Sequence, residues 1–216
     1  MRAWLDSFDA RLYRAGLLLQ HDDAAATLYL RPCGEDRVLA AATDVHLEHG
    51  PVQTLPPGTL RVRVEEHLAP RAALIIARQP LAVETLDLVD EAGKIRVRGH
   101  VEVPLDGEAP RPDEPARLHV QALRGFTDDA RRLRRRLERR GLEHAGCERA
   151  EAAAARTDGP GFGYRSRPDC PLDPAEPAGV ALARVLGTGF EVAQQNVAGI
   201  LADIDTEFLH DFRTAS

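Results

Sequence analysis

Lysine and aromatic residues are scarce in this chain of 216 residues, and each shortage narrows the choice of protein class. Lys94 is the only lysine, so 27 of the 28 basic residues are arginines. Such a bias reflects either a genome rich in arginine codons or recognition of phosphate, whose oxygens a guanidinium group binds in pairs. The net charge of -6 argues against a protein that coats nucleic acid with its whole surface. Aromatic residues make up only 5%, but 44% hydrophobic residues are enough to form a buried core.

The few cysteines exclude two further classes of protein. Cys33, Cys147 and Cys170 are odd in number and far apart, and they show neither CxxC nor Cys/His spacing. This spacing supports neither a disulfide framework nor a zinc site, so we expect reduced thiols. The N-terminal stretch "MRAWLDSFDARLY" has acidic residues where a signal peptide has its apolar core, and no apolar run reaches membrane-spanning length. These absences predict a soluble cytoplasmic protein that does not bind membranes.

Motifs for catalysis are also missing. The sequence has no GxSxG motif and no Walker loop, and "GTGFE" (187–191) does not follow a predicted strand as a dinucleotide-binding loop would. Carboxylates do not repeat along one strand face, as a magnesium site would require. From the residues alone we expect no catalytic residue, no metal site and no cofactor.

Residues 1 to about 103 carry the short alternating patterns of β-strands. Leu28 and Leu30 alternate with other residues in "TLYLR", which is typical of a half-buried strand. "AVETLDLVD" and "KIRVRGHVEV" are separated by turn residues, which predicts a hairpin, and "RLHVQAL" predicts a further strand. The stretch 59–68 fits two patterns. Leu60, Val62 and Val64 alternate with polar residues as in a strand. Leu60, Val64 and Leu68 also follow helical spacing, which the flanking prolines favour.

The rest of the chain alternates between helical and irregular patterns. "FTDDARRLRRRLERRGL" predicts a helix that Thr127 caps and Gly141 ends. Residues 143–179 are dense in proline and glycine after an alanine-rich piece that could extend this helix, and they predict a linker. Residues 180–204 predict a long helix. A second helix follows, with Asp205 as its cap and an apolar side formed by Phe208, Leu209 and Phe212.

Three groups of basic residues are candidates for binding a polyanion. The strand group could line a groove, or it could merely keep the outer face of a sheet solvated. The arginine-rich helix allows the same two interpretations. His210 and Arg213 lie side by side at helical spacing, although a single histidine near a helix end is usually structural. The strand candidates are Lys94, Arg96, Arg98, His100, Arg117 and His119, and the helix contributes Arg131 and Arg135 among its arginines.

Two stretches resemble known families. "WLDSFDARLYRAGLLL" resembles a segment of the CYTH-type triphosphate tunnel domains, and "PRAALIIARQPLAVETLDLVDEAGKIRVRG" is similar to their middle strands. "ILADIDTEFLHDFRTA" resembles the start of the CHAD domain, the conserved-histidine α-helical module. The resemblance implies an α+β fold in which a partial antiparallel CYTH-like barrel (1–142) and a linker (143–179) precede the first helices of a CHAD domain (180–216). It further implies that His210 and Arg213 bind inorganic polyphosphate.

Departures from the CYTH pattern imply a loss of catalysis. CYTH enzymes open with a strand of alternating acids, and this chain begins after the place where that strand would be. The matching final strand, "RLHVQAL", has His119 and Gln121 where acids help to hold the metal. We therefore expect a degenerate domain and a protein that binds polyphosphate in the cytoplasm or at polyphosphate granules without hydrolysing it.

Two rival functions stay open. One is a magnesium-dependent triphosphatase of the CYTH type. The other is an interaction module that binds no anion and dimerises through its C-terminal helices. The resemblance also implies that the CHAD domain is truncated, so that Phe208, Leu209 and Phe212 would lack the remaining bundle. Such an apolar patch would favour self-association.

Overall fold

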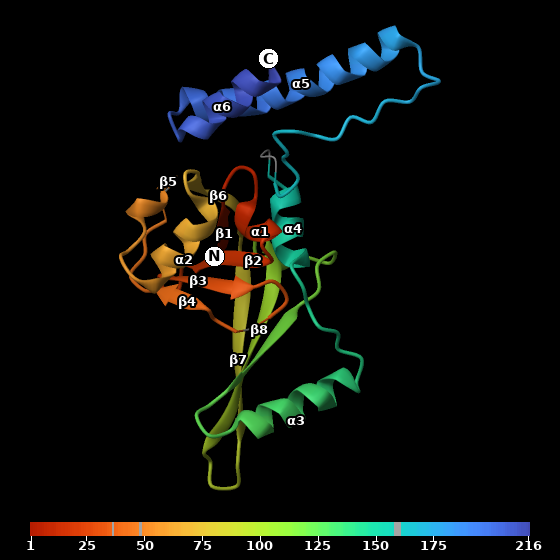
Figure 1. Ribbon diagram of the computed structural model, residues 1–216. Helices are drawn as coiled ribbons and strands as arrows, with labels where there is room; N and C mark the ends of the chain where they lie inside the picture. Colours follow the sequence, from red (N-terminus) through yellow and green to blue (C-terminus); the bar gives the residue numbers. More distant parts are fainter. Residues whose placement is uncertain (36, 48, 158–160) are drawn as a thin grey trace.

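The computed structural model describes residues 1–35, 37–47, 49–157 and 161–216. Its strands form a curled antiparallel half-barrel with helices around it, and a helical hairpin follows at the C-terminal end (Figure 1). The prediction of an α+β fold is therefore confirmed. None of the helices formed by the described residues has the length and apolar character needed to cross a bilayer.

The first sheet is built around the N-terminal strand. β1 (Arg2–Asp6) lies between β2 and β6 and pairs with both in antiparallel fashion. The six strands, in spatial order, are β4 (Ala40–Ala42), β3 (Thr27–Pro32), β2 (Leu17–Asp22), β1, β6 (Ala72–Gln79) and β5 (Gly50–Pro51). The short helix α1 (Arg11–Arg14) connects β1 to β2, and the 3-10 helix η1 (Val52–Thr54) follows β5.

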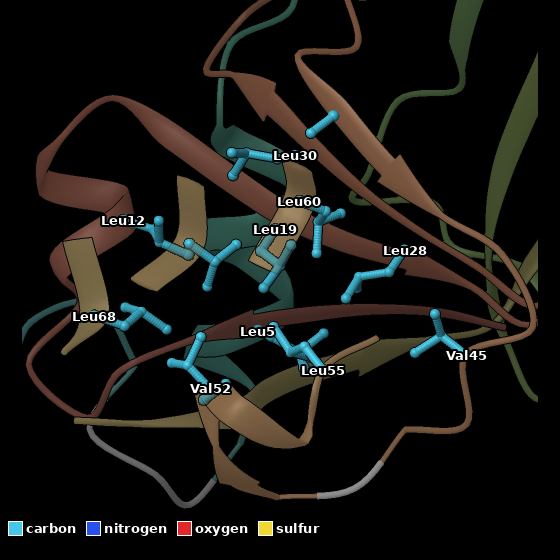
Figure 2. Close-up of a cluster of buried hydrophobic side chains, with 13 residues drawn as sticks. Leu5, Leu12, Leu19, Leu28, Leu30, Val45, Val52, Leu55, Leu60 and Leu68 are labelled. Carbon is cyan, nitrogen blue, oxygen red and sulfur yellow. The ribbon is translucent and has the colours of Figure 1, made fainter. Parts of the chain in front are cut away.

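One face of this sheet carries the larger hydrophobic core. Helix α2 (Thr59–Leu68) buries Leu60, Val64 and Leu68. Figure 2 shows Leu60 and Leu68 in the same cluster as leucines of the neighbouring strands, among them Leu5 and Leu19. Helix α2 confirms the helical interpretation of residues 59–68 over the strand alternative. The i, i+4, i+8 spacing places Leu60, Val64 and Leu68 on one face, which packs on the sheet.

The second sheet projects away from the first. β7 (Leu81–Val89) and β8 (Ile95–Asp106) form the predicted hairpin, and β10 (Arg117–Ala122) pairs with the other side of β8. The short β9 (Ala109–Pro110) pairs with the end of β8. Helix α3 (Thr127–Glu138) covers one face of this sheet, at the end far from the first sheet (Figure 1).

The alternation predicted for β8 is reflected in its two faces. Val97 is buried together with Val120 of β10 and Ala130 of α3. Arg96, Arg98, His100 and Glu102 occupy the other face, because successive side chains of a strand point in opposite directions.

The segment 143–179 contains more structure than a proline- and glycine-rich linker suggests. Helix α4 (Glu148–Ala155) buries Ala150, Ala153 and Ala154 in a second core beside the other face of the first sheet. Just before it, Cys147 is joined to Cys33 by a disulfide, with Cα atoms 5.5 Å apart. The expectation of reduced thiols is wrong for this pair, and Cys170 is not in a disulfide. The two cysteines are 114 residues apart, so only the tertiary fold brings them together.

The C-terminal hairpin forms as predicted but is packed differently. Helix α5 (Ala178–Leu201) is followed by α6 (Thr206–Ala215), and Asp205 caps α6 by accepting hydrogen bonds from the backbone N–H groups of Glu207 and Phe208. The predicted exposed patch is wrong for Phe208, which is 1% exposed. Its ring packs on Phe8, with centroids 4.6 Å apart. Leu209 is exposed and Phe212 is half-buried.

Candidate polyanion-binding surfaces

The predicted site residues do not form one site. Lys94, Arg96, Arg98, Arg131 and Arg135 belong to α3 and the neighbouring hairpin. His210 and Arg213 lie on α6, at the opposite end of the molecule (Figure 1). A single ligand of small size therefore does not contact both groups.

The basic side chains of the hairpin are largely engaged within the protein. Arg98 binds Asp87 with two hydrogen bonds of 2.7 and 2.9 Å, and this partner lowers the pKa of Asp87. The Nε atom of Arg96 lies 3.2 Å from Asp90 Oδ2. Lys94 and Arg96 also lie over the ring of Phe126, at 5.1 and 5.6 Å from its centroid. These contacts hold the hairpin against the start of α3 and leave little charge for a ligand.

Arg117 is also engaged in a structural contact. It donates hydrogen bonds to the carbonyl oxygen of Gly146 at 3.1 Å and to Glu148 Oε2 at 3.0 Å. It thereby connects β10 to the segment that leads into α4. The sequence placed Arg117 on a basic strand face, but it did not predict this helix or its acidic first turn.

A buried ion cluster lies where the two sheets meet, and sequence reasoning missed it. Glu102 of β8 lies 2.6 Å from Arg2 of β1, 2.7 Å from Arg149 of α4 and 3.2 Å from His119 of β10. Burial alone would raise the pKa of Glu102, but its hydrogen bond to His119 and the charges of Arg2 and Arg149 lower it to about 2. This carboxylate is therefore ionised at neutral pH and balances the surrounding cations. The sequence held one signal for this cluster: Glu102 is an acidic residue on the strand face that otherwise carries basic residues.

Positive charge is concentrated in the segment that contains helix α3. Residues 124–140 contain eight arginines and three acidic residues, a net charge of +5 in a chain of net charge -6. Arg131 and Arg132 pair with Asp128 and Asp129 one turn earlier, each at 2.6 Å. In the described parts of the chain, no carboxylate lies within ion-pair distance of the arginines in and after the last turns of α3. These exposed residues are Arg135, Arg136, Arg139 and Arg140.

His210 lines a cavity of about 280 Å³ between α6, the start of α1 and the segment before α5. The lining residues are Asp9, Arg11, Arg71, Ser166, Arg167, Glu207, His210, Asp211 and Thr214. Arg11 pairs with Asp9 at 3.0 Å and lies 3.7 Å from Glu207, so the charges of this cavity nearly balance. Arg213 is exposed on the last turn of α6 and does not line it. The cavity is therefore a weaker attractor for a polyanion than α3.

The residue after His210 joins the hairpin to the half-barrel. Asp211 is buried and forms an ion pair with Arg71, which follows α2. Tyr164 donates a hydrogen bond to Asp211 at 3.0 Å and accepts one from Asn196 of α5 at 2.8 Å. Burial raises the pKa of Tyr164 to about 12. The signal for this contact was present in the sequence, because Asp211 stands three residues after Phe208 on the apolar side of α6 and needs a buried cation.

The described residues contain no group of three or more histidine, cysteine, aspartate or glutamate side chains placed to hold a metal ion. The chain matches no protein-family model, no curated protein and no solved structure.

Proposed function

We propose that this protein binds inorganic polyphosphate, or a similar phosphate polyanion, through the exposed arginines at the C-terminal end of α3 and just after it, and that it does not hydrolyse the ligand. The observation that supports the proposal is the set of four exposed arginines, Arg135, Arg136, Arg139 and Arg140, which have no carboxylate partner in the described residues. Guanidinium groups at this density suit phosphate oxygens, which they bind in pairs.

The charge distribution favours a localised contact. Because residues 124–140 carry +5, the rest of the chain carries -11. A polyanion is therefore attracted to one segment and repelled elsewhere, which argues against wrapping of nucleic acid around the whole molecule. The resemblance of "ILADIDTEFLHDFRTA" to the CHAD domain supports polyphosphate as the ligand, with His210 and Arg213 as a second, weaker contact. On this proposal the protein is cytoplasmic and associates with polyphosphate granules.

A titration with long-chain polyphosphate at low and moderate salt tests the proposal. Arg135→Ala/Arg139→Ala removes two charges from one face of α3. The variant should bind polyphosphate more weakly. By analogy with nucleic acids, the slope of log K against log salt concentration should become shallower by roughly 0.7 to 0.9 for each phosphate that is no longer neutralised. Arg63→Ala/Arg78→Ala removes two exposed arginines elsewhere and is the matched control, which should bind as the wild type does.

Three outcomes would change the proposal. Equal losses of affinity in the α3 variant and its control would show that only net charge matters. A loss confined to His210→Ala/Arg213→Ala would move the site to α6. Phosphate release from tripolyphosphate with Mg²⁺ would contradict the non-catalytic assignment and support the CYTH-type triphosphatase instead.

A further inference from the structure

Helix α5 carries a row of exposed apolar side chains that the described parts of the chain leave uncovered. Leu186, Phe190 and Leu201 are 63, 62 and 82% exposed, and Leu182 and Val197 continue the row at 59 and 40%. With 3.6 residues per turn, these five positions fall within roughly 100° of the helix circumference. We call this row the α5 stripe. Continuous apolar surface of this extent is rare on monomers and typically marks an interaction site.

The other sides of α5 are already occupied. Val192, Ala193, Asn196 and Gly199 are buried. Gly199 lies against Phe208 of α6, and Asn196 donates a hydrogen bond to Tyr164 in the segment before α5. Arg184, on a different side, contacts the preceding segment through Glu176 at 2.9 Å and the carbonyl oxygen of Pro171 at 2.8 Å. The centre of the stripe is offset by about a third of a turn from the centre of this buried side. In addition, the N-terminal half of α5 extends past the end of α6 (Figure 1). A further helix can therefore approach the stripe without displacing any part of the chain.

The stripe is complementary to itself when two copies run in opposite directions. A two-fold axis between Glu191 and Val192 places Leu182 opposite Leu201 of the second copy and Leu186 opposite Val197. In the same register Phe190 comes opposite Ala193, a small residue that is 8% exposed in the single chain. Charge does not oppose this pairing, because the 24 residues of α5 include only two charged ones, Arg184 and Glu191, and neither lies on the stripe. Antiparallel helix dipoles also attract each other.

We propose that two copies of the chain associate through antiparallel pairing of their α5 stripes, so that α5 and α6 of both copies form a four-helix bundle. In such a bundle each helix contacts two neighbours. Helix α5 would contact α6 of its own chain on one side and, through the stripe, α5 of the second copy on another. The five stripe side chains expose on the order of 600 Å² per copy, given about 100 to 150 Å² each. Burial on both copies then totals roughly 1,200 Å², which reaches the lower limit of specific interfaces. This inference is independent of the proposed ligand.

Sedimentation of the full chain over a range of concentrations tests the interface. The wild type should sediment as a dimer that dissociates on dilution. Phe190→Glu and Leu186→Glu should each raise the dimer dissociation constant by more than about tenfold, because they place a charge in the centre of the stripe. Val180→Glu is the matched control, since Val180 is 56% exposed on α5 but lies outside the stripe. Far-ultraviolet circular dichroism confirms that the variants are folded.

A cross-linking experiment tests the register. In a Cys170→Ala background, Leu182→Cys and Leu201→Cys chains are mixed under mild oxidation. The mixture should form a disulfide-linked pair that neither variant forms alone. Residues 182 and 201 are about 28 Å apart along one helix, so a doubly substituted chain cannot form this bond within itself.

Several results would overturn the proposal. A wild type that stays monomeric at high concentration excludes the interface. Cross-linking of Leu201→Cys chains to one another indicates a parallel arrangement and contradicts the register. Dissociation by Leu88→Glu, but not by Phe190→Glu, places the interface on the exposed edge of β7 instead.

Discussion

Glu102 shows how a single carboxylate can hold several elements of this fold together. It connects strands of both sheets and helix α4 through Arg2, His119 and Arg149. Arg149 is buried, and burial lowers its pKa to about 10, so it stays charged at neutral pH beside Glu102. A buried ion pair contributes little over an apolar pair of the same shape, but breaking one is costly because it leaves a buried charge without a partner.

We therefore predict that Glu102→Gln destabilises the protein by about 3 kcal/mol, since it leaves Arg2 and Arg149 without this carboxylate. Urea denaturation at neutral pH measures the change. Glu84→Gln, at an exposed position of β7, is the control and should stay within about 0.5 kcal/mol of the wild type. Destabilisation of similar size in both variants would contradict a special role for Glu102.

The same carboxylate predicts a pH dependence. Its pKa is about 2 in the folded protein and has an ordinary value of 4.5. Because the folded pKa is lowered, the stabilisation is complete above the ordinary value and is lost as the pH falls from about 4.5 toward 2. The stability difference between wild type and Glu102→Gln should therefore shrink over this range. A difference that stays constant down to about pH 2.5 would show that Glu102 is not ionised in the fold.

At the scale of elements, the packing of α6 on α5 depends on a glycine. Gly199 lies directly under the ring of Phe208, and a Cβ atom at this position would overlap three of the ring carbons. Phe208 is 1% exposed, so its ring has no free space into which it could move. Near the other end of the contact, a Cβ on Gly189 would lie 2.9 Å from the carbonyl oxygen of Ala215. These two glycines let the helices approach closely.

Gly199→Ala should therefore destabilise the hairpin. The clash should cost about 1 to 3 kcal/mol, which outweighs the gain of up to about 1 kcal/mol in helix propensity. Gly187→Ala is the matched control, because no atom lies within 4 Å of the added Cβ and the substitution should stabilise α5 slightly. Thermal unfolding of the two variants should shift the transition in opposite directions. Equal stabilisation of both would show that Phe208 does not pack on Gly199.

Elements with a local signal were predictable from the sequence. The alternation in β8, the spacing of Leu60, Val64 and Leu68 in α2, and the capping aspartate before α6 each depend on neighbouring residues. Contacts between distant segments were not predictable in this way. Helix α4 is only eight residues long, and its alanine-rich sequence precedes a stretch of proline and glycine that predicts a linker. The disulfide and the burial of Phe208 depend on the tertiary fold, which local periodicity does not specify.

Candidate site residues show the same limit. The sequence shows where the basic residues stand but not which residues they pair with. Arg98 and Arg117 are bound to Asp87 and Glu148, and these pairs form between strands or between a strand and a helix. The arginines at the end of α3 differ because their helix has few acidic residues within reach, which composition alone indicates.

At the scale of the whole molecule, a buried network of ion pairs and hydrogen bonds and an aromatic cluster hold the hairpin on the half-barrel. Arg71 pairs with Asp211, and its guanidinium lies 3.6 Å from both Asp9 and Asp205. Asp205 also accepts a hydrogen bond from the backbone N–H of Ala72 at 2.8 Å. The guanidinium therefore forms ion pairs with both parts of the molecule, since Asp9 follows β1 in the half-barrel and Asp205 and Asp211 belong to the hairpin.

The aromatic cluster offers a direct probe of this docking. Trp4, the only tryptophan, is 3% exposed and belongs to the same hydrophobic core as Phe8, Tyr164 and Phe208. Removal of the hairpin would expose this core to water. The emission of Trp4 should then shift to longer wavelength even while the two sheets stay folded.

Asp211→Asn should therefore undock the hairpin before the half-barrel unfolds. The substitution removes the charge that Arg71 pairs with inside the interface, at a cost of about 3 kcal/mol. In a denaturant titration, the shift of Trp4 emission should precede the loss of strand signal in circular dichroism, whereas the wild type should show one transition. Asp203→Asn makes the same chemical change at an exposed position of the hairpin and should behave as the wild type does. If the two signals of Asp211→Asn coincide, the hairpin and the half-barrel unfold as a single unit. The ion pair between Arg71 and Asp211 would then not control the docking of the hairpin separately from the stability of the half-barrel.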